Sequence, residues 1–340
     1  MYMVKLEKGN KYIDNVPMLK WGEWRDNTYC GSIAMAANIL DIPASYEYIM
    51  GVSGLCYRFA MKPDSCPSSA LVQNGTVWDE NINKALGIEM YSMDDDIKRD
   101  ENVKNSISSG VPVICMGQIG PPEWGIIAGY SENDKTFFGR SYFDSQNIHP
   151  SNPYFSNDNI FYTENNYCCA NDYPGVYPKL FMRFFDRSCA KDEPIELLKK
   201  SLEICLKYYE HNEFNECKFG ESAINILIDN LKKSDRGSEN YHLGILADAR
   251  CSAYVYLKES ASLLKGKNQE KLKNVSLLYK SVKDRIISVV PYEMLTDAFN
   301  GNPKEPWNSD ICKKLIDVLY EIIDTEKQIQ ILVKDILANW

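Results

Sequence analysis

The chain has 340 residues, of which 44% are hydrophobic and 25% are charged, a composition typical of a globular protein of about two domains. Its 47 acidic and 38 basic residues give a formal net charge of −9, and no Lys/Arg-rich run stands out, so we expect no binding to nucleic acid or to a membrane surface. No segment approaches the roughly 18 apolar residues that cross a bilayer, and the N-terminus lacks a secretory apolar core, which predicts a cytoplasmic protein.

The first strong helical pattern covers residues 28–40, TYCGSIAMAANIL. Thr28 is a suitable N-cap residue, and apolar positions from Ile33 to Leu40 recur at helical spacing. The pattern therefore predicts a helix that carries Cys30 in its first turn.

The rest of the N-terminal half predicts an α+β domain in which helices pack on an antiparallel sheet. A short second helix is predicted over residues 45–50, and the glycines of the MGVSG segment end it. Asn, Ser, Asp and Pro dominate residues 145–178, which predicts an irregular excursion. Short runs rich in β-branched and aromatic residues predict strands at 55–59, 111–117, 125–131, 135–143 and 177–185.

Long amphipathic patterns begin at Pro194 and predict an all-helical C-terminal domain. Comparable patterns then cover about residues 217–233, 239–264, 269–289 and 308–338. Their apolar stripes are typical of the core of a bundle of about five helices rather than of cofactor contacts. We therefore divide the chain into a domain at 1–190 and a domain at 191–340.

Cysteine and histidine do not form a metal-binding pattern. The 11 cysteines are scattered without a CxxC pair and are odd in number, which favours buried thiols over a disulfide framework. The three histidines, His149, His211 and His242, have no Cys or His at ligand spacing. We expect neither a metal nor another cofactor.

Cys30 is the candidate nucleophile. A thiol in the first turn of a helix lies where unpaired backbone N–H groups and the helix dipole favour the thiolate. The small residues Gly31 and Ser32 leave room for a carbonyl substrate, and the Cys30 backbone N–H can form half of an oxyanion hole. We expect the Cys30 sulfur to lie at the mouth of a groove.

Thr28-Tyr29-Cys30-Gly31-Ser32, the helix after it, the MGVSG segment and the hydrophobic strand that ends in Gly129-Tyr130 resemble a known group of papain-like domains. The similarity spans about residues 15–185 and includes the peptidase domain of proteases that process double-glycine leaders. It is closer to the N-terminal domain of the butirosin biosynthesis protein H family. The resemblance implies a papain-like fold and transfer of an acyl group from a carrier protein.

The resemblance also implies roles for individual residues. In these relatives the general base is a His six residues before the Gly of the Gly-Tyr pair, and in this sequence that position is Glu123. Asp144, at the end of RSYFD, takes the place of the residue that orients the base. Apart from the resemblance, His149 is an alternative base because it follows Asp144 by only five residues. The family Gln that completes the oxyanion hole is replaced by Trp24.

A substrate groove is expected around the start of the helix that carries Cys30. Aromatic side chains there would suit a small amphipathic ligand, and loops after the second helix face the same cleft by analogy with the fold. The candidate substrate-binding residues are Trp24, Asn27, Tyr29, Gly31, Ser53, Arg58 and Trp124.

Two functions remain open from the sequence. In the first, the chain is a thiol-dependent acyltransferase or a hydrolase of amides or thioesters, in which Cys30 attacks, Glu123 or His149 moves the proton and Asp144 orients the base. In the second, the domain is catalytically inactive and binds a small molecule, a peptide or a carrier protein. The missing family His and Gln support the second function, whereas Cys30 at the helix start and Asp144 after the strand support the first.

Overall fold

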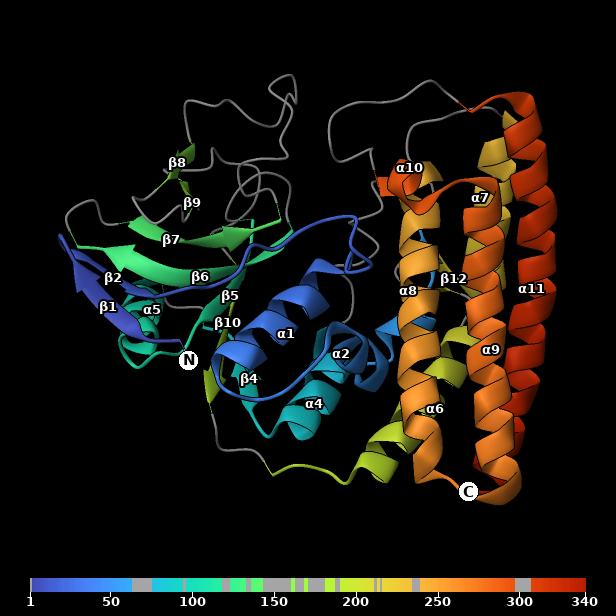
Figure 1. Ribbon diagram of the computed structural model, residues 1–340, viewed down its shortest axis with the longest axis horizontal. Helices are drawn as coiled ribbons and strands as arrows, with labels where there is room; N and C mark the ends of the chain where they lie inside the picture. The colour runs from blue at the N-terminus through green and yellow to red at the C-terminus, as the bar shows by residue number, and fades with distance from the viewer. Residues whose placement is uncertain are drawn as a thin grey trace. The chain divides into compact units, whose positions relative to one another are not determined.

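The computed structural model describes residues 2–62, 75–93, 96–117, 123–132, 136–142, 160–162, 168–170, 181–186, 190–210, 213–214, 216–233, 239–296 and 307–340. The chain forms two compact units (Figure 1). The first, the sheet unit, consists mainly of Met1–Ser45 and Leu86–Ala190, and the second, the helical unit, of Tyr46–Ala85, Lys191–Ala298 and Asn302–Trp340. The division expected after residue 190 coincides with one boundary, whereas residues 46–85 lie in the helical unit.

The sheet unit is built on an antiparallel sheet with the strand order β4-β10-β5-β6-β7-β9-β8, to which β2 adds beside β6 and β1 beside β2. The strands are β1 (Val4–Glu7), β2 (Asn10–Ile13), β4 (Glu89–Tyr91), β5 (Val113–Met116), β6 (Trp124–Ser131), β7 (Thr136–Ser141), β8 (Ile160–Tyr162), β9 (Cys168–Ala170) and β10 (Phe181–Asp186). The predicted combination of helices with an antiparallel sheet is confirmed.

The apolar sequence WGIIAGYS makes β6 the buried centre of this sheet. Every residue from Gly125 to Ser131 is buried, and successive strand residues point to opposite faces, so both faces of β6 are covered. The helices α1 (Thr28–Ile39) and α5 (Asp96–Ser108) both pack against β5 and β6. The helix predicted at 28–40 is therefore present and lies on the central strands.

The helical unit contains the long helices that the amphipathic patterns predict. Its elements are α2 (Tyr46–Val52), η1 (Leu55–Tyr57), α4 (Gly75–Leu86), α6 (Pro194–Glu210), α7 (Gly220–Lys233), α8 (Glu239–Ser260), η3 (Ala261–Leu263), α9 (Gly266–Val289), α10 (Tyr292–Thr296) and α11 (Ser309–Ala338). Across the described ranges, no helix is long and apolar enough to span a membrane.

Two details of the helical unit differ from the sequence prediction. The strand predicted at 55–59 is wrong, because the described chain forms the 3-10 helix η1 there. The unit is also not purely helical, since β3 (Ala60–Met61), β12 (Cys217–Phe219) and β11 (Glu213–Phe214) form a small antiparallel sheet. Residues 217–219, predicted as the start of a helix, are therefore a strand.

The MGVSG segment packs inside the helical unit. Ser201 Oγ of α6 donates a hydrogen bond to the Gly51 carbonyl at 2.7 Å, and the buried Ser53 hydroxyl donates to the Met50 carbonyl at 3.1 Å. A Cβ at Gly51 would lie 2.0 Å from Cγ of the Tyr256 ring on α8. Gly51 therefore allows close packing of α2 on α8.

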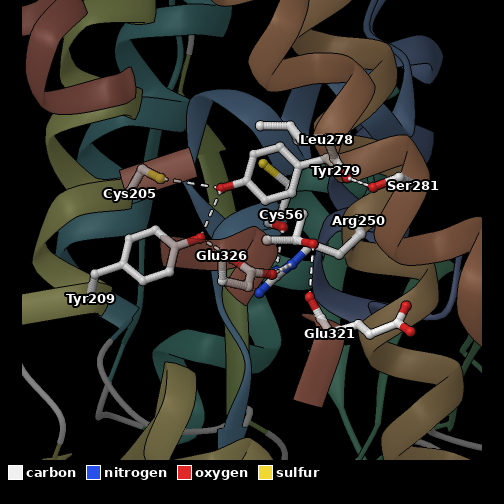
Figure 2. A network of polar contacts seen from close by, with 10 residues as sticks. Cys56, Cys205, Tyr209, Arg250, Leu278, Tyr279, Ser281, Glu321 and Glu326 are labelled. Carbon is white, nitrogen blue, oxygen red and sulfur yellow. Dashed lines mark hydrogen bonds and ion pairs between the residues drawn. The ribbon is translucent and has the colours of Figure 1, made fainter. Parts of the chain in front are cut away.

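A buried polar network joins four helices of this unit (Figure 2). Arg250 Nε of α8 donates to Glu326 Oε1 of α11 at 2.6 Å, and Arg250 Nη1 donates to the Cys56 carbonyl at 2.9 Å. The Tyr209 hydroxyl of α6 donates to Glu326 Oε2 and lies 3.3 Å from the Tyr279 hydroxyl of α9. Burial disfavours the Arg250 charge, yet the Glu326 carboxylate holds the Arg250 pKa above its ordinary value.

We expect Arg250→Met to lower the free energy of unfolding of the helical unit by about 3–5 kcal/mol, because it leaves the buried Glu326 carboxylate without its cation. The double variant Arg250→Met, Glu326→Leu should lose much less, since no unpaired charge remains. Urea unfolding followed by circular dichroism measures both. Equal losses in the single and double variants would contradict the assignment of Glu326 as the partner that carries the charge.

Two glycine substitutions test the packing of α2 on α8. Gly51→Ala should lower the free energy of unfolding by about 1–3 kcal/mol, because the added methyl group overlaps the Tyr256 ring. Gly244→Ala is the matched control in α8: its Cβ would meet Leu295 at 3.5 Å, so the higher helix propensity of Ala should leave stability unchanged or raise it by up to about 1 kcal/mol. Thermal unfolding of the two variants shows whether the predicted order holds.

Candidate functional site

Cys30 lies in the first turn of α1, as predicted, but its side chain is 0% exposed. The expectation that its sulfur lies at the mouth of a groove is therefore wrong for this structure. The helix is capped by Asn27 rather than by Thr28: Asn27 Oδ1 accepts the Cys30 backbone N–H at 3.0 Å. The N–H that was expected to serve an oxyanion hole is thus already used by the cap.

Glu123 precedes β6 and contacts the same turn of α1. The Thr28 hydroxyl donates a hydrogen bond to Glu123 Oε2 at 2.6 Å and accepts one from the Trp124 backbone N–H at 3.3 Å. Thr28 is therefore a bridge between the start of β6 and the helix turn that contains Cys30. The position to which the sequence resemblance assigns the base thus lies against the helix of the candidate nucleophile.

The Glu123 carboxyl is nearly sealed from water, with 6% of the residue exposed. Burial raises the Glu123 pKa to about 7, and the hydrogen bond from Thr28 opposes this shift. No charged side chain of the described residues contributes to the shift. At neutral pH this carboxyl is therefore protonated in part of the molecules and can both give and take a proton, whereas an exposed glutamate is almost fully ionised.

Tyr142 fills the space at Gly31 that was expected to admit a carbonyl substrate. A Cβ at Gly31 would lie only 1.8 Å from the Tyr142 hydroxyl oxygen, and that hydroxyl donates to the Arg25 carbonyl at 3.1 Å. The Tyr142 ring packs 4.9 Å from the ring of Trp21. Gly31 therefore accommodates an aromatic side chain of this protein.

Aromatic side chains gather at the start of α1, as the sequence indicated. The Tyr29 ring lies 4.9 Å from the Trp124 ring, and Trp124 meets Phe181 of β10 edge to face at 5.7 Å. Trp24 lies just before the helix with a positive φ of 59°. The sequence did not indicate Phe181 as part of this cluster, because only the register of the paired strands brings it beside Met116 and Trp124.

The remaining predicted site residues fall in the other unit or outside the described residues. Ser53 and Arg58 belong to the helical unit. Arg58 is buried there with its guanidinium over the rings of Trp78 and Phe219, at 4.9 and 5.6 Å, and burial lowers its pKa. Asp144 and His149 lie outside the described residues. Within the described ranges, no group of three or more His, Cys, Asp or Glu residues could hold a metal ion.

The raised pKa of Glu123 predicts a pH dependence of stability. The unfolded chain releases this proton near pH 4.5 and the folded chain near pH 7, so the stability contributed by the protonated carboxyl is complete below pH 4.5 and is lost as the pH rises to 7. Glu123→Gln keeps the shape without the ionisation. The free energy of unfolding of this variant, relative to the unmodified protein, should rise by about 2–3 kcal/mol from pH 5 to pH 8.

Denaturant unfolding followed by tryptophan fluorescence measures this difference. Glu89→Gln on β4, where the side chain is exposed, is the matched control and should show no comparable trend. The burial of the ionisable carboxyl would be contradicted if the difference in free energy of unfolding between Glu123→Gln and the unmodified protein stayed constant across this pH range.

Comparison with protein families and curated proteins identified no relative of this chain. The resemblance to papain-like domains therefore rests on the residues around Cys30 and on the strand that ends in Gly129-Tyr130.

Proposed function

We propose that the sheet unit is a papain-like domain without thiol catalysis that binds a small molecule, a peptide or a carrier protein. The observation that carries this proposal is the complete burial of Cys30. Its papain-like character is supported by the place of Cys30 in the first turn of a helix that packs on the centre of an antiparallel sheet. Glu123, which occupies the position of the family base, lies against that turn.

Two further features support the inactive form over the enzyme. Thiol catalysis needs an accessible sulfur, a donor for the oxyanion and space for the reacting carbonyl. In this structure the Cys30 N–H donates to Asn27, and the Tyr142 hydroxyl fills the space beside Gly31.

A binding role has its best support at the edge of the aromatic cluster. Phe181 is 44% exposed and continues the row of Tyr29 and Trp124 rings from the buried helix turn to the surface. The Arg183 guanidinium lies 4.5 Å from the centre of the Phe181 ring. An exposed ring beside a guanidinium offers an apolar face and positive charge, which suits a ligand with an apolar part and an acidic group.

The thiol-dependent enzyme remains a second candidate because one observation favours it. The Glu123 carboxyl, with a pKa of about 7, is attached through Thr28 to the turn that carries Cys30. In that reaction the Cys30 sulfur would attack a thioester or amide carbon, and the leaving thiol or amine would take up the proton that Glu123 removes from Cys30. A substrate could use the space beside Gly31 only after Tyr142 moved away from it.

Alkylation with iodoacetamide at pH 6, read by peptide mass spectrometry, separates the two functions. We expect Cys30 to react as slowly as Cys115, a fully buried thiol of β5 whose pKa is raised by burial. Hydrolysis of acetyl-N-acetylcysteamine, a simple thioester, should be equal in the unmodified protein and in Cys30→Ala. Rapid selective labelling of Cys30, or thioester hydrolysis that Cys30→Ala abolishes, would support the enzyme and overturn the proposal.

A further inference from the structure

The helical unit contains a stretch from the N-terminal half of the chain. The chain leaves the sheet unit after Ser45, contributes Tyr46–Ala85 to the helical unit and enters the sheet unit again at Leu86. The inserted segment is Tyr46–Met61, which comprises α2, η1 and β3. Part of the helical unit is therefore encoded well before its long helices begin at Pro194.

The inserted segment belongs to the core of the helical unit. Its helix α2 packs on α6 and α8, and η1 packs on α8. The large apolar side chains of the segment that are at most 4% exposed are Tyr46, Ile49, Met50, Val52, Leu55, Tyr57, Phe59 and Met61. Side chains this deeply buried stabilise a fold only while the surfaces that cover them are in place. The segment and the C-terminal helices therefore share one core.

Two buried polar side chains of α8 bind the inserted segment near its start and near its end. The Tyr46 hydroxyl donates to Asp248 Oδ2 at 2.6 Å, and Arg250 Nη1 donates to the Cys56 carbonyl at 2.9 Å. Asp248 and Arg250 are 2% and 1% exposed. A buried polar group that loses a hydrogen-bond partner destabilises the fold, and hydrogen bonds to charged groups are the stronger ones. The surface of α8 is therefore matched to this segment.

The contacts of the segment also reach α6 and the strand before α7. Ser201 Oγ of α6 donates to the Gly51 carbonyl at 2.7 Å and lies 3.0 Å from the Tyr57 hydroxyl. Strand β3 pairs with β12, and the Gly220 N–H donates to the Phe59 carbonyl at 3.1 Å. Three elements from different parts of the C-terminal sequence thus meet on one short stretch of chain.

We infer that the C-terminal helices form a binding surface whose ligand is the inserted segment of the same chain, so that the helical unit is complete only when both halves of the chain are present. A division of the chain after residue 190 then cuts through one folded unit. The inference goes beyond the proposed function and does not depend on it, because it uses no residue of the sheet unit.

Cleavage of the folded full-length chain tests this binding. A recognition sequence for a specific protease is inserted between Ala190 and Lys191, which are both exposed. After cleavage, the two pieces should elute together from a size-exclusion column at about 1 μM and separate only in denaturing urea. A piece of residues 191–340 that elutes alone and keeps its helical circular dichroism would overturn the inference.

Two glycine variants of the cleavable chain assign the association to the inserted segment. Gly51→Ala should weaken the binding of the two pieces about tenfold or more, because its methyl group overlaps the Tyr256 ring of the other piece. Gly244→Ala is the control, since its Cβ would meet Leu295 of the same piece at 3.5 Å. Both variants are first checked for unchanged circular dichroism. Equal dissociation constants in the two variants would show that other contacts hold the pieces together and would overturn the inference.

Hydrogen exchange in the uncut, unmodified chain provides a test without substitutions. In increasing urea, the amides of α2 and η1 should lose their protection together with those of α8, because segments of one cooperative unit open together. Loss of protection in α2 while α8 stays protected would show that the C-terminal helices fold without the inserted segment, and the inference would be wrong.

Discussion

The sheet unit depends on the burial of one carboxyl between a helix and a strand. Glu123 is taken out of water at the start of β6, and its hydrogen bond from Thr28 fixes where the first turn of α1 lies. Two further contacts hold the same helix turn. Asn27 caps it by accepting the Cys30 backbone N–H, and Tyr142 packs against Gly31. The thiol that the sequence proposed as a nucleophile is therefore packed as a core residue.

Sequence reasoning predicted the elements whose pattern is strong. The helix at 28–40, the strands that became β5, β6 and β7, and the long C-terminal helices have clear periodicity. It missed α5, because that helix is mostly polar and buries few residues such as Val103 and Ile107. The prediction of a strand at 55–59 was wrong because an apolar run does not by itself specify an extended backbone. The 3-10 helix η1 is stabilised by a residue far away in the sequence, since Arg250 donates a hydrogen bond to the Cys56 carbonyl.

The candidate site was only partly predictable for a related reason. The place of Cys30 in the first helical turn, and of Glu123 beside it, follows from local pattern and from the family resemblance. The contact of Tyr142 with Gly31 and the row from Trp124 to Phe181 depend on long-range packing that no local pattern encodes. Loops after the second helix were expected to face the cleft, whereas Gly51 of the MGVSG segment serves the packing of α2 on α8 within the helical unit.

Titration of the Glu123 side chain itself tests the central claim most directly. The carboxyl carbon signals of a protein labelled with 13C at Glu Cδ can be followed by NMR from pH 4 to pH 9, and the Glu123 signal is the one that disappears in Glu123→Gln. A buried carboxyl held only by Thr28 should titrate with a pKa of about 7. A midpoint near 4.5, the value of an exposed glutamate, would show that Glu123 is not sealed against α1 and would contradict the account of how Cys30 is closed.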